Sequence, residues 1–72
     1  MINMTLIDVR TMRSLYGHSN VRTAIVPRHA EHVVANGMHD GKLTKRWIVA
    51  RVEWEFLDGE TYAEIILTPE VP

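Results

Sequence analysis

Residues 47–68 read WIVARVEWEFLDGETYAEIILT, and this stretch predicts the fold more clearly than any other part of the chain. Apolar and polar residues alternate on both sides of Asp58-Gly59. An Asp-Gly pair between two such runs favours a type I′ turn, because both central residues of that turn need a positive φ. We therefore expect a β-hairpin with its turn at Asp58-Gly59.

A two-residue turn also determines which residues of the two strands face each other. The expected pairs on one face are Phe56 with Thr61, Trp54 with Ala63, Val52 with Ile65 and Ala50 with Leu67, and Ile48 extends this face. Because a slip of one residue would expose the whole apolar set, the register is well specified. We predict burial of the residues at the centre of this face, which are Val52, Trp54, Ile65 and Leu67.

The opposite face of the hairpin mixes acidic and aromatic side chains, and we predict that it binds a protein. Its candidate residues are Trp47, Arg51, Glu53, Glu55, Tyr62, Glu64 and Ile66. Aromatic residues supply contact area in interfaces, and carboxylates speed association with a basic surface. Glu53 falls opposite Glu64 in this register, where like charges destabilise the pair. The alternative is an ordinary solvated sheet face.

Two segments before the hairpin are predicted as helices. Pro27 suits the first position of a helix and Gly37 suits the residue just past its end, so we expect a helix over residues 27–36. Over residues 5–16 the apolar residues fall on one broad helical face, which also favours a helix. The alternative for residues 5–16 is a strand through Ile7, Val9 and Thr11.

The whole chain is predicted as a single α+β domain over residues 1–72. Its 72 residues, 46% of them hydrophobic, suffice for one domain with a small core. Residues 21–26 are rich in β-branched side chains and stop at a proline, so we expect a strand there. One or two N-terminal helices would then pack on a small antiparallel sheet that ends in the C-terminal β-hairpin, at about residues 47–68.

The net charge of −1 hides a strong separation of charge along the chain. Residues 1–51 hold all eight Lys and Arg residues and three acidic residues, a net charge of +5. Residues 52–72 hold six acidic residues and no basic one, a net charge of −6. Such asymmetry indicates charged partners or head-to-tail contact between copies. The alternative is that the two halves neutralise each other within one fold.

The sequence offers little for catalysis or for metal binding. It contains no cysteine, and its four histidines, His18, His29, His32 and His39, follow no ligand-spacing motif. His29 and His32 would share a face of the predicted helix, but that face is polar. A chain of this length rarely encloses a substrate pocket. We expect no enzyme activity, no cofactor and no bound metal.

Nothing in the sequence predicts export or membrane insertion. Residues 1–5 have no basic flank and no apolar run, so we expect no signal peptide. No stretch approaches the ~18 continuous apolar residues that a membrane span needs. We expect a cytoplasmic protein without membrane contact, and a homodimer would suit its small core.

The basic residues form a second candidate surface, made of Arg10, Arg13, Arg22 and Arg28. They are spread over several predicted elements and do not form one run. A protein that binds duplex DNA normally has a basic stripe and a high isoelectric point. The isoelectric point here is ≈ 6.4, so nucleic acid is the less favoured partner.

Two short stretches resemble phage Cro-type repressors. Thr5-Leu6-Ile7-Asp8 is similar to the start of these proteins, and Asp58-Gly59-Glu60-Thr61-Tyr62-Ala63-Glu64, followed by Pro69 and Pro72, is similar to their end. The two stretches cover about a fifth of the chain. The resemblance implies a small helix-plus-hairpin protein that binds DNA. In the middle of the chain, Glu31 stands where a buried aliphatic residue belongs and Pro27 lies near the start of the recognition helix, so no DNA-contacting residue is carried over.

Size, charge and the acidic aromatic face together predict a small non-enzymatic regulatory protein. Such a protein would bind and modulate a larger protein machine. By analogy of size and charge with phage-encoded inhibitors, the machine would be a host RNA polymerase and the role transcription regulation. The alternative is a small Cro-like DNA-binding transcriptional repressor.

Overall fold

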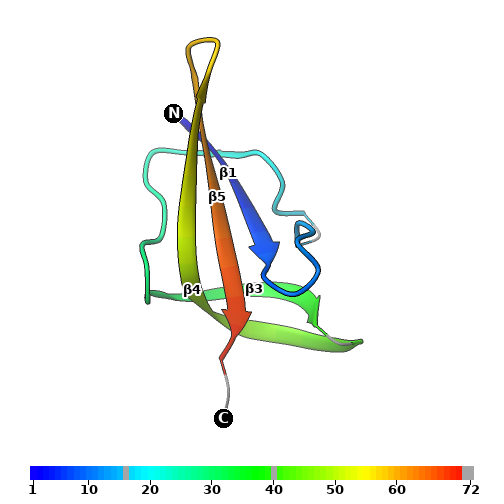
Figure 1. The fold of residues 1–72 in the computed structure, drawn as a ribbon. Coiled ribbons are helices and arrows are strands. Elements are labelled where there is room, and N and C mark those ends of the chain that lie inside the picture. Colours follow the sequence, from blue (N-terminus) through cyan, green and yellow to red (C-terminus); the bar gives the residue numbers. More distant parts are fainter. Residues whose placement is uncertain (16, 40, 71–72) are drawn as a thin grey trace.

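The computed structural model describes residues 1–15, 17–39 and 41–70, which form five β-strands and no helix. The strands are β1 (Ile2–Asp8), β2 (Val21–Thr23), β3 (His32–His39), β4 (Lys42–Leu57) and β5 (Glu60–Pro69). They build one sheet in the order β2-β1-β5-β4-β3, which curves into a half-barrel (Figure 1). The described ranges therefore contain no helix that is long and apolar enough to span a membrane.

The predicted α+β class is wrong, because the described residues of both segments predicted as helices form strand, turn and loop. In the first segment, residues 5–8 belong to β1, which agrees in part with the strand alternative. Turns follow Asp8, and Tyr16 lies outside the described residues. β1 runs parallel to β5, from Ile2 beside Thr61 to Asp8 beside Leu67. Pairing with a strand so distant in the chain leaves no local signal, and the apolar face of residues 5–16 fits a helix equally well.

The second predicted helix, residues 27–36, is a loop as far as residue 31 and then the first part of β3. The backbone of Ala30 and Glu31 already pairs with β4: Ala30 N–H donates to Val49 O at 2.9 Å, and Val49 N–H donates to Glu31 O at 2.9 Å. Ala30 also has a φ of 69°, outside the helical region. The backbone groups that a helix would use are therefore occupied by the sheet.

β2 and β3 form the two edges of the sheet. β2, Val21–Thr23, is shorter than the strand predicted over residues 21–26 and pairs antiparallel with β1. β3 pairs antiparallel with the first part of β4, where His32 lies opposite Ile48. Beyond Val49, β5 is the only strand that pairs with β4 among the described residues.

The C-terminal hairpin is confirmed, and its strands are longer than predicted. Phe56 pairs with Thr61, Trp54 with Ala63, Val52 with Ile65 and Glu53 with Glu64, all as expected. Asp58 and Gly59 have φ values of 50° and 78°, as a type I′ turn requires. The turn chemistry therefore sets the register over the outer half of the hairpin.

A β-bulge at Ala50 changes the register in the inner half of the hairpin. Arg51 pairs with Ile66 and Val49 pairs with Leu67, so the predicted Ala50–Leu67 pair is wrong. The extra residue reverses the alternation of β4. Trp47 and Val49 consequently join the face of Leu67 and are almost completely buried, instead of facing outward.

The core lies on the concave face of the sheet and is centred on Trp47. It contains Leu6, Leu15, Ala35, Trp47, Val49, Ala63, Ile65 and Leu67. The indole Nε1–H of Trp47 donates to the carbonyl oxygen of Ala35 at 2.9 Å, and His39 meets the indole edge to face. Val52 is only partly buried and Trp54 is 45% exposed, so the predicted burial of Trp54 is wrong.

Candidate functional site

The hairpin face that we predicted as a binding surface lacks two of its apolar residues. Trp47 lies in the core because of the bulge at Ala50, and it is 0% exposed. Ile66 is also fully buried, between Ile7 of β1 and Arg51 of β4. The expectation that both side chains face outward is wrong, and neither can contact a partner while the sheet is intact.

The remaining residues of that face form a mainly acidic surface. Arg51, Glu53, Glu55 and Glu64 are exposed, and Tyr62 is half-buried. Arg51 Nε donates to Glu53 Oε2 at 2.6 Å. This ion pair offsets part of the repulsion between Glu53 and Glu64, which face each other as predicted.

The exposed aromatic residues of the hairpin lie on its other face. Trp54 and Phe56 are 45% and 72% exposed, and their rings stack with centroids 6.4 Å apart and planes at 9°. We name this region the acidic tip and define it by Glu53, Trp54, Glu55, Phe56, Leu57, Asp58 and Glu60, all of them exposed. The sequence predicted burial of Trp54 and placed Phe56 on the same face. The small residues opposite them, Thr61 and Ala63, were the available signal that little covers these rings.

A pocket of ≈ 370 Å3 lies beside Trp54. It is lined by Val26, Pro27, Arg28, His29, Arg51, Val52 and Trp54. Arg28 is held near its own loop, because its Nε lies 3.9 Å from Glu31 Oε1 and its backbone N–H donates to the same oxygen. The pocket therefore joins the loop after β2 to the inner end of the acidic tip.

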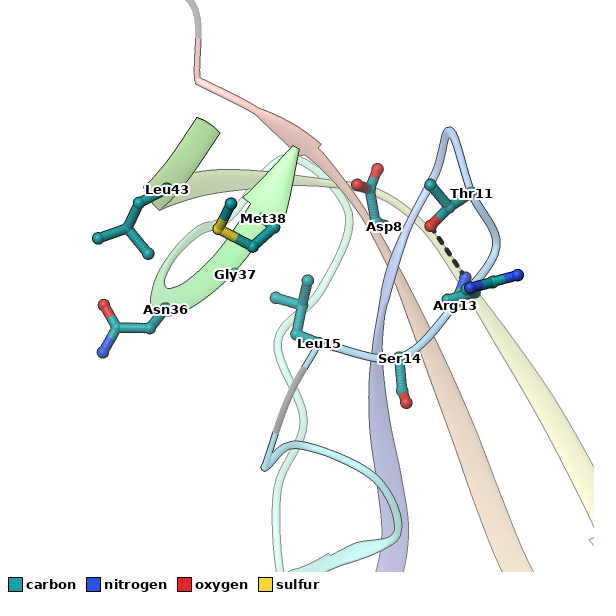
Figure 2. A pocket seen from close by; sticks show the side chains of 9 residues that line it. All are labelled: Asp8, Thr11, Arg13, Ser14, Leu15, Asn36, Gly37, Met38 and Leu43. Atoms are coloured by element: carbon teal, nitrogen blue, oxygen red, sulfur yellow. Dashed lines mark hydrogen bonds between the residues drawn. The ribbon is translucent and has the colours of Figure 1, made fainter. Parts of the chain in front are cut away.

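A second pocket, of ≈ 460 Å3, lies at the opposite end of β4 (Figure 2). It is lined by Asp8, Thr11, Arg13, Ser14, Leu15, Asn36, Gly37, Met38 and Leu43. Met38 pairs with Leu43 across β3 and β4, and both are exposed. Arg13 lies on the far side of the pocket from these two residues, where its backbone N–H donates to Thr11 Oγ1 at 3.2 Å.

We name this region the basic end. It is defined by the pocket together with Arg13, Lys42, Lys45 and Arg46, which are all exposed. The three β4 residues flank Leu43 in the chain, and Arg13 comes from the turns after β1. Arg13 thus lines the apolar recess itself, and the three β4 cations lie in the same stretch of strand as Leu43.

Asp8 holds the end of β1 against β3 at the edge of the basic end. It is 2% exposed, and both carboxylate oxygens lie 3.1 Å from His39 Nδ1. Its Oδ1 also accepts the backbone N–H of Arg10 at 3.0 Å. In Figure 2 the Ser14 side chain points away from Asp8, so the pocket does not place this hydroxyl beside the carboxylate.

The predicted basic surface is divided between separate parts of the molecule. Arg13 lines the pocket of the basic end and Arg28 lines the pocket beside Trp54. Arg22 lies on β2, at an edge of the sheet, and Arg10 follows β1. The four arginines therefore share no single pocket.

The histidines are dispersed as well. His29 lines the pocket beside Trp54, while His32 begins β3 and lies 3.4 Å from Glu70 Oε2. Among residues 1–15, 17–39 and 41–70, no three His, Asp or Glu side chains come close enough together to hold a metal ion.

The predicted role as a phage-type transcription regulator rested on size, charge and the Cro-type resemblance. That resemblance implies a helix-plus-hairpin fold, whereas the described residues form a β-sheet with the hairpin alone as predicted. Comparison of the chain with protein-family models, with curated proteins and with solved structures finds no match. The regulatory, inhibitory and phage-type features are therefore unsupported, and we do not retain them.

Proposed function

We propose that this chain is a non-enzymatic protein-binding module and that its acidic tip is the contact surface. The observation that carries the proposal is the stacked pair of Trp54 and Phe56, which is exposed on a strand rich in carboxylates. The surface that fits this tip is an apolar recess with a basic rim.

The aromatic pair is suited to supply most of the binding free energy. Interface residues that cost about 2 kcal/mol or more on truncation are enriched in tryptophan and tyrosine and lie in desolvated pockets. The two rings are already stacked and are held by a tight turn, so little conformational entropy is lost on binding. The sheet thus presents a preorganised apolar projection.

The carboxylates of the tip are suited to speed association. Glu55, Asp58 and Glu60 are exposed at the same end of the hairpin as the aromatic pair. Opposite charge on a partner accelerates encounter, and this effect weakens as salt rises. The same charges repel phosphate, and the described residues include no helix that could enter a DNA groove. We therefore do not extend the proposal to duplex DNA, and a cytoplasmic location stays a prediction.

The test is a binding comparison between matched surface variants. The immobilised chain captures partners from a cell extract, and each captured protein is then purified and its affinity measured. Combined Trp54→Ala and Phe56→Ala substitution should weaken binding by about 30-fold, which corresponds to about 2 kcal/mol. Ile25→Ala removes an equally apolar residue that is 81% exposed outside the tip, and it should bind as the wild type does.

Two further measurements make the test decisive. Circular dichroism establishes that each variant keeps its β-sheet signal. Glu53→Lys with Glu55→Lys should slow association more than it speeds dissociation. Folded tip variants that bind every purified partner with wild-type affinity would show that the acidic tip is ordinary solvated sheet.

A further inference from the structure

β4 carries opposite charges at its two ends, and the structure keeps them apart. Lys42, Lys45 and Arg46 stand near its start, while Glu53 and Glu55 stand near its end. At about 3.3 Å per residue, the seven residues from Arg46 to Glu53 span about 23 Å. This distance is well beyond the ~8 Å over which charges act at physiological salt. The two groups therefore do not neutralise each other within one copy.

The ion pairs of the described residues agree with this separation. They join Arg28 to Glu31, His32 to Glu70, His39 to Asp8, and Arg51 to Glu53. No described pair joins a cation of the basic end to a carboxylate of the acidic tip. The two parts of the chain do meet in the pairs Arg51–Glu53 and His32–Glu70, so neutralisation within the fold is partial and does not extend to the cations of the basic end.

The two ends are also complementary in shape. Phe56 and Leu57 project from the acidic tip as exposed apolar side chains. The basic end contains a pocket of ≈ 460 Å3 with apolar walls from Leu15, Met38 and Leu43. Among the described residues, the Asp8 and Glu70 carboxylates near the basic end lie against His39 and His32. Arg13 is the one Lys or Arg residue in the described lining of the recess, and Lys42, Lys45 and Arg46 follow nearby in β4.

Within one copy the tip cannot reach this recess. The molecule measures 39 × 21 × 17 Å, and Figure 1 shows the hairpin turn and the start of β4 at opposite ends of its long direction. Every other copy of the chain carries an apolar recess lined by Arg13 and close to exposed cations of β4, which is the kind of surface that the proposed function requires of a partner.

We propose that the acidic tip binds the basic end of a second copy, so that copies associate head to tail. This inference rests on the proposed function and names its partner. The contact is heterologous, since each copy uses two different surfaces, and it extends into an open array or closes into a ring. Phe56 enters the pocket, and the carboxylates of the acidic tip lie towards the cations of the basic end.

The test exploits the two different surfaces. One variant reverses the tip with Glu53→Lys and Glu55→Lys, and the other reverses the basic end with Lys45→Glu and Arg46→Glu. Sedimentation velocity over a range of concentrations should show assembly of the wild type that weakens as salt rises. Each variant alone should associate at least about tenfold more weakly, because like charges then meet. An equimolar mixture should regain assembly, since each reversed surface finds its complement.

Control variants separate this inference from the proposed function. Phe56→Ala should weaken assembly without changing its salt dependence, and Ile25→Ala should have no effect. A wild type that stays monomeric at low salt and hundreds of micromolar overturns the inference, as does a mixture that stays monomeric. If the wild type is monomeric but the Trp54 and Phe56 variants bind a captured partner of another sequence more weakly, the proposed function stands without self-association.

Discussion

Gly37 sets the distance between β3 and the core. A Cβ atom on this residue would lie 2.6 Å from Leu15 Cδ2 and 3.0 Å from Trp47 Cζ2. Both distances are shorter than the contacts that packed side chains adopt. The prediction that Gly37 ends a helix is wrong, because this glycine lies within a strand and is needed for close approach.

Replacing Gly37 with alanine should therefore destabilise the fold. We expect the free energy of unfolding to fall by about 1–3 kcal/mol, the usual cost of overpacking a core, and urea denaturation measures it. The Leu15 tip is the nearest obstacle, so Leu15→Ala should reduce the cost of Gly37→Ala in a double-mutant cycle. Strictly additive effects would mean that the clash with Leu15 is not what makes alanine unfavourable.

At the scale of elements, the outer hairpin was predictable because its information is local. Asp58-Gly59 fixes the turn, and the alternation beyond it fixes pairs as far as Val52 with Ile65. The bulge at Ala50 has no local sequence signal comparable to Asp58-Gly59. The alternation of the sequence therefore predicted the wrong face for Trp47. The missed bulge placed Trp47 in the candidate site, whereas Ile66 and Trp54 lie on the predicted faces and only their burial was predicted wrongly.

The predicted helices failed for a related reason. β1 is specified by its pairing with β5, nearly the whole chain length away, and the start of β3 by its pairing with β4. Periodicity over a dozen residues does not report such contacts. The separation of charge could be predicted from the sequence. Because β4 is one long strand, residues that are far apart along it are also far apart in the fold.

Deletion of Ala50 tests the role of the bulge. Without the extra residue, Trp47 and Val49 would move to the outer face and leave the core, since strand side chains alternate. We expect loss of cooperative unfolding and of near-ultraviolet circular dichroism. Deletion of Ala24, an exposed alanine between β2 and the loop before β3, is the matched control and should be tolerated. A stable fold without Ala50 would show that the sheet can repack in the other alternation.

At the scale of the whole molecule, stability should fall from the basic end towards the acidic tip. Around Trp47, β4 has a neighbouring strand on each side, whereas residues 53–57 pair with β5 alone. The core cluster also stops short of the aromatic pair. The tip is therefore both the proposed contact surface and the least supported part of the sheet.

Hydrogen exchange measures this gradient residue by residue. Amides of the tip strands open locally, so they should exchange at least about tenfold faster than those of Val49 and Ile65 in the core. Binding at the tip should slow the exchange of residues 53–60 selectively. Uniform protection along β4 would show that the hairpin end is as stable as the core.

The central position of β5 has a consequence for the order of folding. β3 and β4 are neighbours in sequence and can form a hairpin early, but β1 and β2 have no sheet to join until β5 is synthesised. Parallel pairing of β1 with β5 closes a loop of almost the entire chain, and such non-local contacts slow folding. During synthesis β1 can pair with β2, but its other edge stays open to other chains until β5 is made.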